Sequence, residues 1–275
     1  MQPTTLCNMD CSYCYLPHRR HHRIMSVDVA RATAQAVESW ARRRPVDIVW
    51  HGGEPLTAGR ARLGMLMDCF PDCGITHSIQ TNATLIDQRW CRFFTERSVR
   101  VGISLDGAEC DNTARTDCHG QPMFDRVVRG LRLLIDSGHD VAVIAVVSDP
   151  TPERAQRLYT TVAELGCRWL GVNIEEREGV NQRSNQQPAQ QLQEFWAALA
   201  DVWHSDRRVR LRDIDRVLGY TTGVLDGPHS AEHPVPLDPL PTIAYDGSVT
   251  LISPELAGFR SDRLGEFHCG NVINE

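Results

Sequence analysis

The sequence has no long apolar run, no export signal and no excess of positive charge. No apolar stretch approaches the roughly 20 residues that cross a bilayer, so we expect no membrane span. Residues 1–14 lack a basic stretch followed by an apolar run, which predicts no signal peptide and a cytoplasmic protein. The formal net charge of -6 argues against a nucleic-acid surface spread over the whole molecule.

Cysteine, by contrast, is plentiful, with 10 residues in a chain of 275. A secreted disulfide framework fits poorly, because the chain is long and has no export signal. Cys7, Cys11 and Cys14 lie close together in the run CNMDCSYC. A compact thiolate group is typical of an iron–sulfur cluster. Zinc needs a fourth ligand, which a histidine of the run HRRHHR (18–23) can supply, so both metals stay open on spacing alone.

Strand and helix patterns alternate over the first two thirds of the chain, with short connections that indicate parallel βαβ units. If residues 2–6 supply a first strand, six units form an α/β fold, a partial (β/α)6 TIM-like barrel with fewer strands than a closed barrel. The other expected strands are 46–50, 77–80, 99–105, 141–147 and 169–174, and the expected helices are about 26–43, 57–70, 84–97, 122–138 and 152–165.

The pattern changes after residue 174, and we predict a barrel core over 1–183 and a small C-terminal extension over 184–275. The extension is expected to hold helices and a β-hairpin, the hairpin because two β-rich runs flank Asp246-Gly247. Its parts are a polar loop (175–188), helices (189–204 and 209–220), an irregular stretch (227–241) and the hairpin (242–252).

Four motifs in order resemble the radical S-adenosylmethionine superfamily over about residues 1–175. They are C-x3-C-x2-C with Tyr13 before the last cysteine, HGGEP at 51–55, QTNAT at 80–84 and SLDG at 104–107. The last three resemble the family's GGEP, its QTNGT and the segment that ends its fourth strand. One motif alone would be weak evidence, whereas four on successive elements are specific.

The resemblance implies a [4Fe–4S] cluster on Cys7, Cys11 and Cys14 and S-adenosylmethionine bound to the iron that lacks a protein ligand. One electron splits the sulfonium, and the 5′-deoxyadenosyl radical takes a hydrogen atom from the substrate. The cofactor carries this chemistry, while the protein orients it and excludes water. An electron donor such as flavodoxin or ferredoxin is also implied, and the basic run 18–23 is either a solvated loop or an attractor for such a partner or an acidic substrate.

The motifs also imply which residues contact the cofactor. Glycines let the backbone approach a ligand closely. Glu54 can accept from the methionyl ammonium, and Arg115 can pair with the carboxylate, although a turn and a surface arginine are the structural alternatives. Tyr13 is expected beside the adenine or as a core aromatic. The expected contacts are Tyr13, His51, Gly52, Gly53, Glu54, Asn82, Ser104 and Arg115.

The C-terminal extension resembles a reduced form of the SPASM type found in sulfatase maturases and peptide-modifying enzymes. That type carries further cysteines and one or two auxiliary clusters. Here no cysteine lies between Cys167 and Cys269, and Pro254 stands where a ligand cysteine is expected. We therefore expect one cluster, with an auxiliary cluster from the scattered cysteines left open.

The stretch DPLPTIAYDGSVTLISPELAG resembles peptide maturases that crosslink side chains into cyclophane rings. We expect oxidative crosslinking or modification of a peptide side chain during maturation of a ribosomal peptide (RiPP). The alternatives are modification of a free small molecule, such as an amino acid or amino sugar, and a non-catalytic iron–sulfur or zinc-binding regulator.

Two carboxylates are candidates for the base that such chemistry needs. Glu255 is implied by the match of ISPE to the relatives' YPCD, and Asp106 lies in SLDG beside the cofactor. A base works best when burial raises its pKa towards neutrality. Glu255 can instead cap a helix-like turn over residues 256–259, which Pro254 favours, or lie in solvent.

Overall fold

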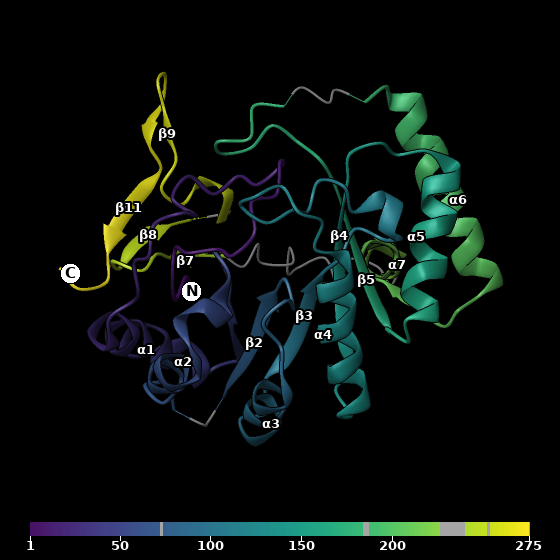
Figure 1. Cartoon of the computed structure of the whole chain (residues 1–275). Helices are drawn as coiled ribbons and strands as arrows, with labels where there is room; N and C mark the ends of the chain where they lie inside the picture. Colours follow the sequence, from purple (N-terminus) through teal and green to yellow (C-terminus); the bar gives the residue numbers. More distant parts are fainter. Residues whose placement is uncertain (72–73, 184–186, 226–239, 252–253, 275) are drawn as a thin grey trace.

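A six-stranded parallel sheet, with its strands in sequence order, forms the body of the protein (Figure 1). The computed structural model describes residues 1–71, 74–183, 187–225, 240–251 and 254–274. The predicted α/β partial barrel is confirmed. The strands are β1 (Val46–Trp50), β2 (Ile75–Thr81), β3 (Arg100–Ser104), β4 (Val141–Val147), β5 (Trp169–Ile174) and β6 (Arg210–Leu211).

Helices connect these strands, and α1, α3 and α5 of those given below follow a residue whose side chain caps the helix N-terminus. Ser26, Asp87 and Thr151 each accept a backbone N–H of the first turn, which satisfies a donor that has no partner within the helix. Every second residue of β4 is buried, as in a strand packed on one face. The helices are α1 (Val27–Ala41), α2 (Arg60–Met67), α3 (Gln88–Glu96), α4 (Phe124–Asp136), α5 (Pro152–Glu164), α6 (Ala189–Ser205) and α7 (Arg212–Leu225).

The expected first strand at residues 2–6 is wrong, and β6 supplies the sixth strand instead. Residues 1–6 bond to several partners rather than to one strand. Thr4 forms an isolated antiparallel bridge with Ile24, and Gln2 donates its N–H to Ile243 C=O at 2.8 Å. Pro3 has no N–H to give to a ladder. The segment therefore ties the barrel to the C-terminal part of the chain.

The C-terminal part contains the predicted hairpin, formed by β7 (Thr242–Ile243) and β8 (Ser248–Thr250). Gly247, at φ +88°, makes its turn. β11 (His268–Asn271) also pairs with β8, and β9 (Arg260–Ser261) pairs with β10 (Gly265–Glu266). In Figure 1 these yellow strands lie beside the purple N-terminal segment.

The proposed division at residues 183 and 184 stays a prediction, and β6 of the second half pairs with β5 of the first. Most of the predicted irregular stretch 227–241, the division itself and part of the ISPE motif lie outside the described residues. None of the helices that the structure describes is long and apolar enough to cross a membrane.

Candidate functional site

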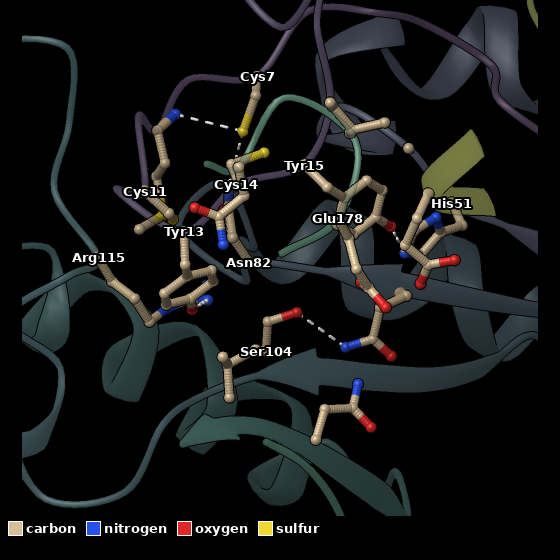
Figure 2. A pocket seen from close by; sticks show the side chains of 18 of the residues that line it. Cys7, Cys11, Tyr13, Cys14, Tyr15, His51, Asn82, Ser104, Arg115 and Glu178 are labelled. Carbon is tan, nitrogen blue, oxygen red and sulfur yellow. Dashed lines mark hydrogen bonds between the residues drawn. The ribbon is translucent and has the colours of Figure 1, made fainter. Parts of the chain in front are cut away.

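One cavity at the carboxyl ends of the strands collects nearly all of the predicted site residues. Parallel α/β barrels form their sites at this end. In Figure 2 the three cysteines gather above Tyr13 and Asn82, with Ser104 below and Glu178 and His51 to one side. The cavity is lined by the predicted residues Cys7, Cys11, Tyr13, Cys14, His51, Gly52, Gly53, Glu54, Asn82, Ser104, Arg115 and Glu255.

Backbone hydrogen bonds hold the cysteine loop in place. Cys7 donates its N–H to Arg19 C=O at 2.7 Å. Asp10 and Ser12 donate theirs to the carbonyls of Thr116 and Ala114, at 2.8 and 3.0 Å. The loop is therefore fixed from both sides by segments that are distant in the sequence.

Burial raises the pKa of all three cysteine thiols, that of Cys11 to about 11. Positive iron would favour the thiolates that burial disfavours. Among the described residues no three His, Cys, Asp or Glu side chains are close enough to hold a single metal ion. A cluster would take its three thiolates on three different irons, whereas one zinc ion needs all its sulfur and nitrogen ligands within about 2.0–2.3 Å. The donor set therefore fits a cluster better than a zinc ion.

The two glycines after β1 bring its end against the segment that leads into the cysteine loop. Gly52 and Gly53 have φ values of +91° and +59°, which favour glycine. A Cβ on Gly53 would lie 2.6–2.8 Å from the carbonyl oxygens of Thr4, Thr5 and Leu6. The close backbone approach seen here is to residues 4–6, and the predicted approach to a ligand stays a prediction.

We expect Gly53→Ala to lose both stability and iron, because the new methyl group must displace backbone just before Cys7. Gly52→Ala is the matched control, since its Cβ would meet the movable side chain of Gln2 at 3.0 Å. Both variants carry the left-handed backbone penalty of about 1–2 kcal/mol. Urea unfolding and iron analysis should show the larger loss for Gly53→Ala, and equal losses would contradict this account.

Glu54 is 1% exposed and links the end of β1 to the end of β2. Its Oε1 accepts from Thr81 Oγ1 at 2.7 Å and from Leu56 N–H at 3.1 Å, and its Oε2 accepts from Asn82 N–H at 2.7 Å. Burial raises the pKa of Glu54, against the effect of these three bonds. A carboxylate has about four acceptor positions, so one on Oε2 remains for a ligand.

The side chains on the floor of the cavity are fixed by one another. Gln80 Nε2 donates to Ser104 Oγ at 2.9 Å, and Asn82 Nδ2 donates to Asn8 Oδ1 at 2.9 Å. His51 Nε2 lies 3.4 Å from Tyr15 Oη, and burial lowers the pKa of His51 to about 4, which leaves a neutral ring at pH 7. These groups offer hydrogen-bonding partners to a polar ligand.

Asp106 does not line this cavity but lies behind Tyr13. Tyr13 donates its hydroxyl to Asp106 Oδ2 at 2.7 Å, and Arg115 Nη1 donates to Tyr13 Oη at 2.8 Å. The base role predicted for Asp106 stays a prediction, and its position favours support of Tyr13 and Arg115 over contact with a substrate.

The loop that follows β5 closes one side of the cavity, and sequence reasoning missed it. Glu175, Glu176, Glu178 and Asn181 line the cavity. Gly179, at φ +53°, fits between Tyr15 and the Glu255 carbonyl, which a Cβ would approach to 3.0 Å. The loop carries no motif, and the only available signal was its place at the end of a parallel strand.

Glu255 faces the same cavity from the C-terminal extension. It lies within a short 3-10 turn, Pro254–Leu256, rather than capping a turn over residues 256–259. Its Oε2 is buried and has no hydrogen-bond partner in the described part of the chain. Burial, with a smaller contribution from Glu176, raises the pKa of Glu255. Glu255 can thus belong to the turn and line the cavity at the same time.

The three arginines of the basic run 18–23 make contacts within the protein. Arg19 Nε donates to Asp10 at 2.7 Å, and Arg20 pairs with the other oxygen of the same carboxylate. Arg23 donates to the Tyr245 hydroxyl. These contacts favour a structural role over a free attractor for partners.

Comparison with known proteins identifies a family and its relatives. The model described as the Radical SAM superfamily matches residues 1–162. The chain is 33% identical over 196 residues to the serine-type anaerobic sulfatase-maturating enzyme of Klebsiella aerogenes, covering 66% of this chain and 47% of that protein. The chain thus spans about half the length of that relative.

Two solved structures share the fold. The structure of anSMEcpe with bound AdoMet matches with a TM-score of 0.75 and 24% identity, over 99% of this chain and 77% of that one. The same protein is also known with AdoMet and the Cp18Cys peptide. Streptococcus suis SuiB bound to the precursor peptide SuiA matches with a TM-score of 0.71 and 14% identity, over 100% of this chain and 62% of that one.

Proposed function

Because the chain belongs to the Radical SAM superfamily, whose members are enzymes, we propose that it abstracts hydrogen from a peptide side chain during maturation of a ribosomal peptide. The proposed outcome is an oxidative crosslink or related modification. One observation carries the proposal: a single cavity holds the three cysteines, the predicted cofactor contacts and Glu255. The electron would come from a donor of the flavodoxin or ferredoxin type.

Cys7, Cys11 and Cys14 would hold the [4Fe–4S] cluster, which fits their shared buried position. When bound, the cluster and S-adenosylmethionine supply the radical that abstracts hydrogen. Glu54 would accept from the methionyl ammonium through its remaining acceptor position, and Arg115 would face the carboxylate. Ser104 and Asn82 would orient the rest, and the loop over residues 175–181 would keep water out.

A peptide substrate is supported by solved structures of the same fold. Proteins of the same fold have been solved with the Cp18Cys peptide and with SuiA. In this chain Glu178 and Glu255 come from separate segments to the same cavity. Mass spectrometry of a candidate precursor peptide, co-expressed with the protein, tests the proposal. Loss of two hydrogens from the peptide is expected, whereas turnover of free amino acids alone would favour a small-molecule substrate.

We expect Glu255→Gln to cleave S-adenosylmethionine but to form little product, because Glu255 would remove the proton that the oxidised substrate must lose. Its unpartnered buried oxygen is available for that proton. Product formation by the parental protein should rise with pH through the raised pKa of Glu255, since only the ionised carboxylate accepts a proton. Glu255→Gln should lose this dependence.

Release of 5′-deoxyadenosine and of product is measured side by side in each variant. Exposed Glu164 of α5 provides the control, because Glu164→Gln removes a carboxylate away from the cavity. Product formed by Glu255→Gln at the parental rate would show that Glu255 is not the base.

A further inference from the structure

A buried ion pair lies beside the part of the cavity that the three cysteines line. Asp106 is 1% exposed and Arg115 is 4% exposed, with Arg115 Nη1 4.0 Å from Asp106 Oδ1. The Tyr13 hydroxyl bridges the two side chains. We propose that this Asp106–Tyr13–Arg115 unit positions a fixed positive charge beside the cluster and thereby sets its reduction potential. The inference rests on the proposed function, because it requires a cluster on the three cysteines.

Backbone hydrogen bonds hold the segment around Arg115 against the cysteine loop. Its neighbours Ala114 and Thr116 accept N–H bonds from Ser12 and Asp10, on either side of Cys11. The side chain lines the same cavity as Cys11 and Cys14. Figure 2 shows Arg115 beside Tyr13, below Cys11. The backbone of Arg115 is thus fixed beside the cysteine loop, and its side chain shares the cavity with the thiols.

Arg115 also has a donor that is unpaired in the described part of the chain. Its Nε is buried and makes no hydrogen bond within the described residues. A buried guanidinium without all its partners is costly unless negative charge stands nearby. Asp106 supplies part of that charge, and a thiolate-bound cluster would supply more.

Hydrogen bonds from other parts of the chain hold Asp106 in place. Its Oδ1 accepts Val146 N–H at 3.0 Å, and its own N–H donates to Asn112 Oδ1 at 3.0 Å. Arg154 donates to its carbonyl oxygen. Burial raises the pKa of Asp106, whereas Arg115 and the hydrogen bonds to both carboxylate oxygens favour the ionised form. Asp106 does not line the cavity but contacts Tyr13 and Arg115, so it is a positioning residue.

The charges act in opposite directions on the cluster. Net charge, hydrogen bonding and burial tune iron–sulfur potentials. A cation beside the cluster stabilises the reduced state, which carries one more negative charge, and burial strengthens the effect. The carboxylate behind the cation offsets part of it. Asp106→Asn should therefore raise the potential, and Arg115→Gln should lower it.

The experiment is a redox titration of the reconstituted protein, followed by the electron paramagnetic resonance of the reduced cluster. We expect an upward shift for Asp106→Asn, a downward shift for Arg115→Gln and a potential near the parental one for Arg115→Lys. Tyr13→Phe keeps both charges and should shift the potential least of the site variants. Exposed Arg126 of α4 gives the control Arg126→Gln, in which water screens the lost charge.

Shifts of Asp106→Asn and Arg115→Gln in the same direction, or no shift in either, would overturn the proposal. If Asp106→Asn takes up no iron, the comparison of Arg115→Gln with Arg115→Lys tests the proposal. Equal reduction potentials in these two variants would then overturn the proposal. A parental protein without a cluster signal would instead refute the cofactor assignment in the proposed function. The two failures are thus distinguishable.

Discussion

Replacement of Cys7, Cys11 or Cys14 by alanine is expected to abolish cleavage of S-adenosylmethionine and to remove most of the bound iron. A cluster with three protein ligands has none to spare, so loss of one thiolate should leave it unstable. The parental protein should contain about four irons per chain after anaerobic reconstitution. Iron analysis, the thiolate-to-iron absorbance and release of 5′-deoxyadenosine measure the three consequences.

Cys110 provides the matched control, because it is exposed and does not line the cavity. Cys110→Ala should keep the iron content and the cleavage rate of the parent. Zinc in place of iron in the parental protein would refute the cluster, and about eight irons per chain would establish an auxiliary one. Full cleavage by any of the three alanine variants would show that the cysteine in question is no ligand.

The residues at the strand ends could be predicted because the fold brings motifs together in a regular way. His51 follows β1, Asn82 follows β2 and Ser104 ends β3, and these three strands are neighbours in the sheet. Side chains at their carboxyl ends must therefore meet at one edge. The local pattern was enough to find these three strands, and the motifs at their ends were enough to expect the three residues in one cavity.

Asp106 shows where strand periodicity stops being a guide. Ser104 and Asp106 are two residues apart and would share a face if β3 continued. β3 ends at Ser104, and Asn112 accepts the N–H of Asp106, so the chain turns away from the cavity. The end of a strand and the partner that turns it are tertiary features that no spacing in the sequence reveals.

The loop after β5 and the missing first strand have the same kind of cause. Gly179 packs between Tyr15 and Glu255, which lie far from it in the sequence. Gln2 bonds to Ile243 near the other end of the chain. Each segment is polar or contains proline and follows no helical or strand period, so its place depends on partners that only the folded chain brings near.

Glu54→Gln is expected to weaken S-adenosylmethionine binding by about 10- to 150-fold, the equivalent of one hydrogen bond to a charged group at about 1.5–3 kcal/mol. The substitution keeps the size of the side chain but replaces one acceptor oxygen by a donor. In the parental protein the Glu54 carboxylate accepts from Asn82 N–H on one oxygen and from Thr81 and Leu56 on the other. The new amide donor must therefore face one of these two sets of donors. One buried bond is lost in either orientation, which should also destabilise the fold by about 1–3 kcal/mol.

Calorimetry on the reconstituted variant separates the two effects, provided that its iron content equals that of the parent. Asp47 of β1 gives the control, because it also accepts bonds from β2, from Thr76 and Ser78, but near the opposite end of the strand. Asp47→Asn should leave cofactor binding unchanged. If Glu54→Gln loses stability and still binds S-adenosylmethionine as the parent does, then Glu54 only joins β1 to β2, and the methionyl ammonium must find its acceptor among the other groups of the cavity.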